Sequence, residues 1–155
     1  MELADLYGSI GHLLRRASQI ANAVFLAEVR ESELTTVQYA TLNTIDQIPG
    51  IDVTRLSGLV ALDRSTLGAV VDRLEAKGLV LRAPGKQDRR LKMLYLTPSG
   101  AAVTRQTDVA AIRVHEQVLA YLTPADRKEL LRILQILVEK GSENLPASIR
   151  ITSES

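Results

Sequence analysis

Apolar side chains recur at helical spacing from Leu3 to about Phe25, so this segment is predicted to form one long amphipathic helix. A second stripe runs from Leu130 to Val138 in a helix that should end at Gly141. A single helix cannot remove such a stripe from water, because the stripe needs a surface to pack against. The two end segments must therefore cover each other or be covered by a second copy of the chain.

The composition supports a packed core and limits the chemistry of the chain. Its 155 residues fit one domain, and 46% of them are hydrophobic, which argues against disorder. The absence of cysteine excludes disulfides, thiolate metal sites and a thiol redox switch. Glu2 and Asp5 stand where a secretion signal would carry positive charge, and no run of about 18 apolar residues could span a bilayer. We expect a cytoplasmic protein that does not enter membranes.

Three shorter helices are predicted in the middle of the chain. Their starts are marked by side chains that can cap a helix, namely Thr35 with Gln38, Asp52, and either Asp63 or Ser65. The first of these helices stops at Pro49-Gly50. The last one buries an apolar face and ends at Gly78, where a left-handed residue is wanted; the face consists of Leu67, Val70, Val71 and Leu74.

After Gly78 the spacing of apolar residues changes from the helical period to the period of a β-strand. Residues 79–82 and 91–96 are predicted strands, joined by a turn at residues 84–88. Thr97-Pro98 and Thr123-Pro124 start two further helices, because each pair places a hydroxyl cap before a proline at the first helical position.

This order of elements predicts a mainly α fold with a small β-wing. Two short helices, a tight junction and a hairpin together describe a winged helix-turn-helix. We expect a single domain over residues 1–155. Within it, residues 35–97 would form the winged helix-turn-helix lobe, and residues 1–32 and 98–145 the dimerisation helices.

Positive charge is concentrated on the predicted lobe. The segment 62–92 holds eight basic and four acidic side chains, a net charge of +4, whereas the whole chain has a net charge of +1. Phosphate binding requires such clustering, because each neutralised phosphate releases condensed counterions. The segment is therefore a candidate DNA-binding surface.

The start of the helix after Leu62 has donors that suit the major groove. Arg64, Ser65 and Thr66 lie at its N-terminus, where backbone N–H groups also point outward. Gly68 would keep this face low enough for close approach to DNA. An ordinary polar helix start has a similar composition, but the basic hairpin that follows favours DNA binding.

The predicted turn and its flank carry Lys86, Asp88, Arg89 and Arg90. A solvated loop could have the same composition. An acid inside a basic tip suggests a second role, since Asp88 could pair with Arg73 or Arg90 and hold the wing at a fixed angle. A wing arginine could then enter a narrow minor groove, where the potential is most negative.

Four short motifs occur in a characteristic order and spacing between Leu62 and Gly100. They are Asp63-Arg64-Ser65-Thr66, Asp72-Arg73-Leu74-Glu75 with Lys77-Gly78-Leu79, Asp88-Arg89-Arg90, and Leu96-Thr97-Pro98-Ser99-Gly100. In these motifs the chain resembles the MarR (multiple antibiotic resistance regulator) family. The flanking helices agree in length and placement, so the resemblance extends to about Gly141.

The resemblance implies an obligate dimer of triangular shape that is usually a repressor. Such proteins are often released from DNA by a small phenolic or aromatic acid. Members that sense oxidants rely on cysteine, which this chain lacks. By matching positions, the recognition helix would carry Arg64, Ser65, Thr66, Gly68 and Arg73, and the wing Asp88 and Arg90.

Four residues are candidates for binding an effector. His12 and Arg16 share one face of the first helix, Tyr39 lies on the second helix and His115 on the fifth. In proteins that the chain resembles, effectors lodge between the dimerising helices and the DNA-binding lobe, where these elements should meet. Arginine suits a carboxylate, and histidine or tyrosine a ring hydroxyl. The alternative is that Arg16 is merely solvated and His12 merely packed.

Nothing in the sequence points to catalysis, a cofactor or a metal site. The two histidines are far apart, and no nucleophile elbow, phosphate-binding glycine loop or paired carboxylates are present. The main hypothesis is a dimeric regulator whose partners are double-stranded DNA, a second copy of the chain and a small aromatic carboxylate effector. The rival is a helical dimeric small-molecule carrier or protein-interaction module that does not bind DNA.

The surplus of apolar stripe at both ends predicts a stable dimer built from the first, fifth and sixth helices. Its operator should be a pseudo-palindrome with half-sites about one helical turn (~34–36 Å) apart. Light scattering at micromolar concentration should give twice the chain mass; a monomer there would contradict the prediction.

Overall fold

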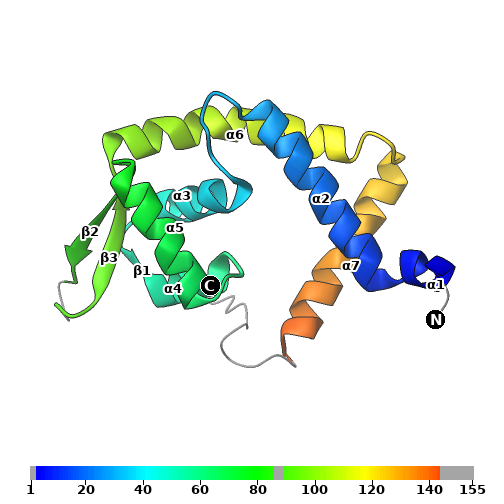
Figure 1. Ribbon diagram of the computed structural model, residues 1–155, viewed down its shortest axis with the longest axis horizontal. Coiled ribbons are helices and arrows are strands. Elements are labelled where there is room, and N and C mark those ends of the chain that lie inside the picture. Colours follow the sequence, from blue (N-terminus) through cyan, green and yellow to red (C-terminus); the bar gives the residue numbers. More distant parts are fainter. Residues whose placement is uncertain (1–2, 86–88, 144–155) are drawn as a thin grey trace.

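The computed structural model describes residues 3–85 and 89–143, and most of these residues are helical (Figure 1). The helices are α1 (Leu3–Gly8), α2 (Ile10–Glu28), α3 (Thr36–Gln47), α4 (Val53–Leu59), α5 (Arg64–Ala76), α6 (Pro98–Val118) and α7 (Pro124–Glu143). The strands are β1 (Ile51–Asp52), β2 (Val80–Pro84) and β3 (Lys92–Leu96). The predicted mainly α fold with a small β-wing is confirmed. The predicted turn residues 86–88 and the tail from Asn144 lie outside the described residues.

The prediction of one unbroken helix from Leu3 to about Phe25 is wrong at Ser9. Ser9 has extended backbone angles (φ −68°, ψ 144°), and its hydroxyl oxygen accepts a hydrogen bond from the backbone N–H of His12. The same hydroxyl donates to the carbonyl of Leu6 at 2.7 Å, which satisfies a group at the end of α1. The apolar spacing continues across this break and conceals it.

Two helix ends also differ from the prediction. Helix α2 extends to Glu28, past the expected end near Phe25, and α7 continues to Glu143 through Gly141. Glycine lowers helix propensity by only about 1 kcal/mol relative to alanine, so one glycine does not have to end a helix.

Side-chain caps start the middle helices where the sequence predicts them. At α3, Thr35 Oγ1 accepts from the Gln38 N–H and Gln38 Oε1 accepts from the Thr35 N–H, which completes a capping box. Asp52 caps α4 through two backbone N–H groups. Of the two candidates before α5, Asp63 is the cap and Ser65 is not. The starts of these three helices therefore follow from the capping residues beside them.

Strand β1 is a feature that the sequence analysis missed. It has two residues and pairs antiparallel with β3, so that Ile51 lies opposite Leu94. The sheet order is β1-β3-β2, with Val80 opposite Leu96 and Pro84 opposite Lys92 in the hairpin. A strand of two residues is too short to show an alternating pattern, so only the fold reveals it.

One apolar core joins α3, α4, α5 and the three strands into a single lobe. Its fully buried members include Leu42, Ile45, Leu56, Leu74 and Leu94. The expected inward face of α5 is confirmed, since all four of its residues are buried. Burying one such side chain contributes about 1.5–3 kcal/mol. This core fixes which face of α5 is left for solvent.

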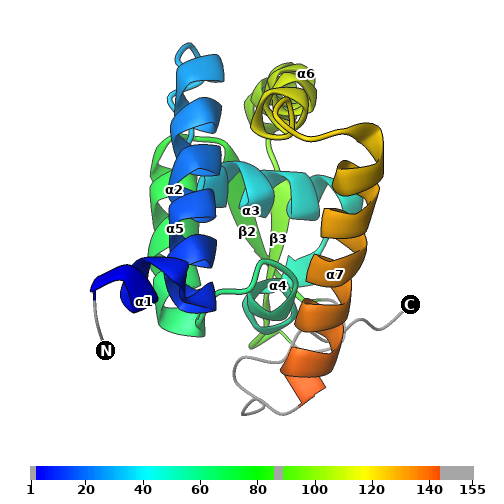
Figure 2. The same cartoon turned by 90° about the vertical axis from the view of Figure 1, so that its right-hand side faces the viewer.

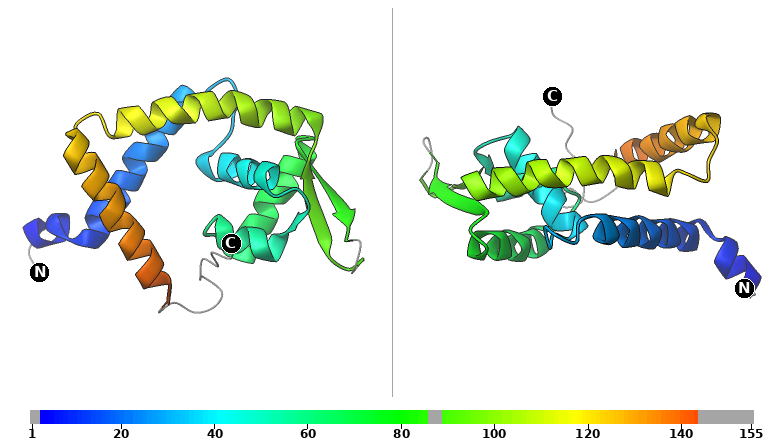
Figure 3. Two further views of the ribbon diagram at one scale, coloured as in Figure 1. Left: turned by 180° about the vertical axis from the view of Figure 1, so that it is seen from behind. Right: turned by 90° about the horizontal axis from the view of Figure 1, so that it is seen from above.

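Helix α6 runs from the lobe to the far end of the molecule, beside α2 over part of its length (Figure 3). The two helices cross around a small buried cluster of Phe25, Val29 and Ala110. Beside it, the Glu28 carboxylate accepts hydrogen bonds from Arg113 Nε at 2.9 Å and Gln117 Nε2 at 2.6 Å. The contacts on α6 thus hold α2 at the side of the molecule away from the wing.

The two end segments do not cover each other. Helices α2 and α7 overlap in the view of Figure 1, but Figure 2 shows them on opposite sides of the molecule. Apolar side chains of both helices are left in water, with Ile10 70% exposed and Ile133 49% exposed. Within residues 3–85 and 89–143, no helix is long and apolar enough to cross a membrane.

The start of α6 lies against the turn between α5 and β2. Thr97 N donates to the Leu79 carbonyl at 3.0 Å and Thr97 Oγ1 donates to the Gly78 carbonyl at 2.7 Å. Gly78 has a φ of 69°, the left-handed conformation expected of it. At Gly100 a Cβ atom would lie only 2.0 Å from the Leu79 carbonyl oxygen. Glycine is therefore required at position 100 for this approach.

We expect Gly100→Ala to destabilise the protein by about 1–3 kcal/mol, because the backbone must move to admit the methyl group. Gly68→Ala is the matched control, since its Cβ would meet nothing within 4 Å. The control should stabilise α5 by up to about 1 kcal/mol. Urea unfolding at one chain concentration measures both. Equal midpoints for Gly100→Ala and the parent would contradict the prediction.

Candidate functional site

The N-terminus of α5 presents polar side chains at the surface of the lobe. Arg64, Ser65, Thr66 and Arg73 are exposed, while the opposite face of α5 is buried in the core. Gly68 is half-buried, and the space above it is open. The structure thus places the five residues expected on the recognition helix on one helix with its polar face outward.

Asp63 and Thr66 form a closed pair at this helix start. Asp63 Oδ1 accepts from the Thr66 N–H at 2.9 Å, and its Oδ2 accepts from the Thr66 hydroxyl at 2.5 Å. The Thr66 side-chain hydrogen bond is the main cause that lowers the pKa of Asp63. The hydroxyl proton of Thr66 is therefore engaged, and the group is left to accept a hydrogen bond or to offer its methyl group.

The wing is the hairpin of β2 and β3. Its last described cross-strand bond runs from the Gly85 N–H to the Leu91 carbonyl at 2.9 Å. Arg89 and Arg90 are exposed just before β3. Lys86 and Asp88 lie outside the described residues, and so does the expected pairing of Asp88 with Arg73 or Arg90.

Arg82 joins the wing to α5, a role that the sequence analysis did not assign to it. Its Nη2 lies 2.5 Å from Asp72 Oδ1, and its Nη1 pairs with Glu75 Oε2. Burial lowers the pKa of Arg82, but the hydrogen bond to Asp72 and the charge of Glu75 outweigh it, so the pKa is raised. The spacing of two acids by three residues on a helix was the available signal, without an indication of which cation they meet.

Two of the four residues expected to bind an effector lie together. Tyr39 and His115 line a cavity of about 440 Å³ between α3 and α6, with Asp108, Ala111, Ile112 and Glu116. His12 and Arg16 do not line this cavity in the single chain. Arg16 Nη1 donates to Gln19 Oε1 at 3.0 Å on the same helix, and the His12 ring packs edge-on against Tyr7 with centroids 5.0 Å apart.

A hydrogen-bonded group beside this cavity links the lobe to α6. The Tyr39 hydroxyl donates to Asp108 Oδ1 at 2.8 Å, and Asn43 Nδ2 donates to the same oxygen at 3.2 Å. Burial and then the neighbouring Asp108 raise the pKa of Tyr39 to about 12. Sequence reasoning missed Asp108 and Asn43, because they are far apart in the chain and match no motif.

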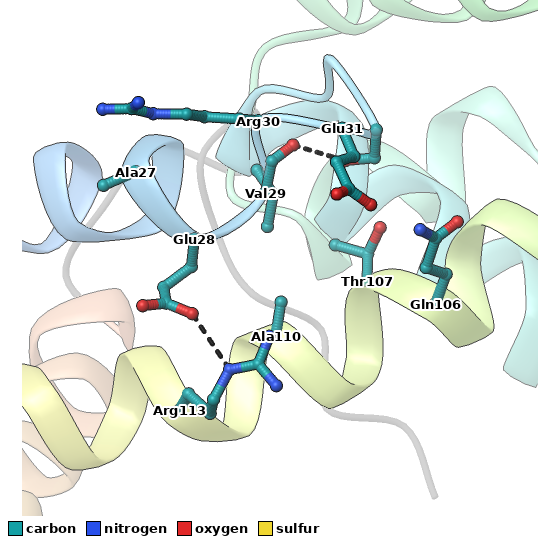
Figure 4. A pocket seen from close by; sticks show the side chains of 10 residues that line it. Ala27, Glu28, Val29, Arg30, Glu31, Gln106, Thr107, Ala110 and Arg113 are labelled. Atoms are coloured by element: carbon teal, nitrogen blue, oxygen red, sulfur yellow. Dashed lines mark hydrogen bonds and ion pairs between the residues drawn. The ribbon is translucent and has the colours of Figure 1, made fainter.

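A second cavity of about 330 Å³ lies where the end of α2 meets α6 (Figure 4). Glu28 and Arg113 point toward each other and form an ion pair, whereas Arg30 points away from the other lining side chains. The hydrogen bond from Arg113 is the main cause that lowers the pKa of Glu28. None of the residues expected to bind an effector lines this cavity. In the described part of the chain, no three metal-binding side chains cluster at a potential metal site.

Comparisons with known proteins agree with this geometry. Residues 34–92 match the family model of the MarR family. The putative transcriptional regulatory protein for the hcr operon of Thauera aromatica is 33% identical over 147 residues, which cover 94% of this chain and 88% of that protein.

Two solved structures are similar over nearly their whole length. The PcaV transcriptional regulator of Streptomyces coelicolor in complex with its natural ligand has a TM-score of 0.82 and 33% identity, covering 91% of this chain and 99% of that one. Bordetella bronchiseptica BpsR, whose DNA binding is regulated by 6-hydroxynicotinic acid, has a TM-score of 0.80 and 28% identity. That match covers 84% of this chain and 94% of the BpsR chain.

The environment of Tyr39 gives a pH-dependent prediction. The raised pKa means that the neutral phenol of Tyr39 stabilises the folded state. This stabilisation is complete below pH 10.0, the ordinary pKa, and is lost as the pH rises through about 12. Tyr39→Phe should remove the tyrosinate absorbance step near pH 12 and cost about 1 kcal/mol at neutral pH. Tyr121→Phe, at a side chain that is 94% exposed, is the control and should keep that step. If the absorbance step near pH 12 persists in Tyr39→Phe, it belongs to another group and the prediction is wrong.

Proposed function

The chain belongs to the MarR family of transcriptional regulators, and from this membership we propose that it is a dimeric repressor that binds a specific operator and releases it when a small aromatic carboxylate binds. One observation carries the proposal. The exposed N-terminus of α5 and the hairpin β2–β3 project from one lobe, and the segment that forms them has a net charge of +4 in a chain of +1. Such an excess favours phosphates, and duplex DNA in the cytoplasm is the matching partner.

In the proposed complex, α5 enters the major groove with its N-terminus towards the base edges. Arg64 is long enough to donate two hydrogen bonds from its guanidinium to the edge of a guanine base. Thr66 offers a methyl group or an acceptor oxygen. Open space at Gly68 allows close approach. The wing contributes phosphate and minor-groove contacts through Lys86, Arg89 and Arg90, and α5 contributes Arg73. Asp88 would pair with Arg73 or Arg90 and hold the wing at a fixed angle.

A second copy is needed to cover the apolar faces. Large apolar side chains are exposed on α1, α2, α6 and α7, and contiguous exposed apolar surface marks an interface between proteins. They include Leu6, Tyr7, Ile10, Leu13, Ile20, Val109, Ile112, Ile133 and Leu137. A two-fold dimer that buries them would present two α5 helices to successive major grooves of a pseudo-palindromic operator.

The cavity at Tyr39 and His115 is the proposed effector site. An aromatic ring fits beside Tyr39, but Asp108 and Glu116 make the walls acidic. A carboxylate therefore needs a cation there, because the two acidic side chains repel it. We propose that Arg16 supplies this charge, with His12 as a second hydrogen-bonding group, when a second copy packs against the cavity.

The test begins with genomic fragments retained by the purified full chain. The retained duplex and a shuffled duplex are titrated by fluorescence anisotropy over a range of salt concentrations. Selective, steeply salt-dependent binding is expected. An absence of duplex binding at moderate salt would instead support the carrier or protein-interaction module.

The effector is tested on the same complex. Hydroxybenzoates and hydroxylated pyridine carboxylates are added to the protein bound to its retained duplex, with Arg16→Ala in parallel. At least one compound should release the parent, and Arg16→Ala should need a higher concentration. A response of Arg16→Ala that equals the parent's would remove Arg16 from the site.

Recognition helix and wing should fail differently when mutated. Arg64→Ala should lower discrimination between operator and shuffled duplex by about 1–3 kcal/mol, because a base contact is lost. Arg90→Ala should weaken binding to both duplexes and reduce the salt slope by about 1. Arg132→Ala on α7, which removes the same charge outside the lobe, is the control. An Arg90→Ala variant with unchanged affinity and slope would disprove the wing assignment.

A further inference from the structure

Arg82 occupies a special place on the wing strand. Side chains alternate along β2, so Arg82 shares the face of Val80, which is 2% exposed and belongs to the core. Opposite it in the sheet stands Leu94, which is completely buried. Arg82 therefore continues the inward face of the strand at the rim of the core, where it meets α5 through charge instead of apolar packing.

The two carboxylates that it meets lie one helical turn apart on α5. A planar guanidinium can bind Asp72 and Glu75 at once with different nitrogen atoms, and the compact ammonium of lysine cannot span them in the same way. The Arg82 side chain is 25% exposed and that of Glu75 40%, so solvent screens this pair less than a pair at a free surface, whereas Asp72 is 67% exposed and its pair is screened more. One side chain thus ties the strand to two points of the helix.

The tie constrains the direction of the whole hairpin. From Arg82 onward β2 continues to Pro84 and stays paired with β3, up to Pro84 opposite Lys92. Holding Arg82 against α5 consequently constrains the angle between the hairpin of β2 and β3 and α5. The turn at Gly78 secures the other end of β2 to α5.

We propose that Arg82 is a positioning residue for operator recognition, which clamps the wing to α5 so that the two DNA-contacting elements are presented as one rigid unit. The proposal rests on the proposed DNA-binding function. It differs from simple charge masking, in which Arg82 would only keep Asp72 and Glu75 from repelling phosphates.

Variants of the full chain separate these two roles. Arg82→Lys keeps the charge and loses the fork. The triple variant Arg82→Gln, Asp72→Asn, Glu75→Gln removes the clamp together with both acids, which makes the lobe more positive by one charge than in the parent. Operator and shuffled duplexes are titrated with each variant, and the ratio of the two affinities is the readout.

In the triple variant, affinity for the shuffled duplex should equal or exceed that of the parent, since no acid faces the phosphates. The ratio should fall by about tenfold, the loss expected when one bidentate base contact is misplaced. Arg82→Lys should lower the ratio as well. A triple variant with the parent's ratio would overturn the proposal. If it does not fold, Asp72→Asn and Glu75→Gln singly should each lower the ratio, and unchanged ratios in both would overturn the proposal.

A measurement without DNA distinguishes failure of the clamp from failure of the proposed function. Amide hydrogen exchange of β2 and β3 in the free protein should be faster in Arg82→Gln than in the parent, with α3 unchanged. Equal exchange would overturn the clamp even if the parent binds its operator. If no duplex is selected by the parent, the proposed function fails while the exchange result still decides whether Arg82 holds the wing.

Discussion

The contact between the first turn of α6 and the turn after α5 connects the candidate DNA-reading elements to the rest of the protein. Thr97 bonds to the Gly78 and Leu79 carbonyls, and Gly100 lets the helix come within reach of them. A backbone carbonyl cannot move aside as easily as a side chain, so the first turn of α6 has little freedom to shift relative to Gly78 and Leu79. These contacts hold the first turn of α6 against the end of α5 and the start of the wing.

Helix α6 receives contacts from every other region that matters to the proposed regulation. Near its middle, Asp108 binds Tyr39 and Asn43 of the lobe, and further along the helix Arg113 and Gln117 bind Glu28 of α2. Both cavities also border this helix. A ligand that changes the tilt of α6 has a mechanical route to α5, provided that it binds the two tilts with different affinity.

The sequence predicted what is determined locally and missed what depends on the tertiary structure. Capping by Thr35, Asp52 and Asp63, like the buried face of α5, follows from neighbouring residues, so the lobe could be outlined in advance. The break at Ser9 was hidden by apolar residues on both sides. The Arg82 clamp and the Asp108 group join residues that only the fold brings together. Arg16 and Tyr39 were grouped on family resemblance, and the single chain does not bring them to one cavity.

The exposed apolar stripes of α2 and α7 have a consequence for gene control at low abundance. If pairing is needed to bury them, the fraction of paired chains follows mass action, and at high dilution the number of competent readers falls with the square of the chain number. Cell growth that dilutes the protein would then relieve repression more steeply than dilution of a monomeric reader. Unpaired chains would also expose their apolar helices to proteases. Degradation of these chains would make repression depend still more steeply on the number of chains.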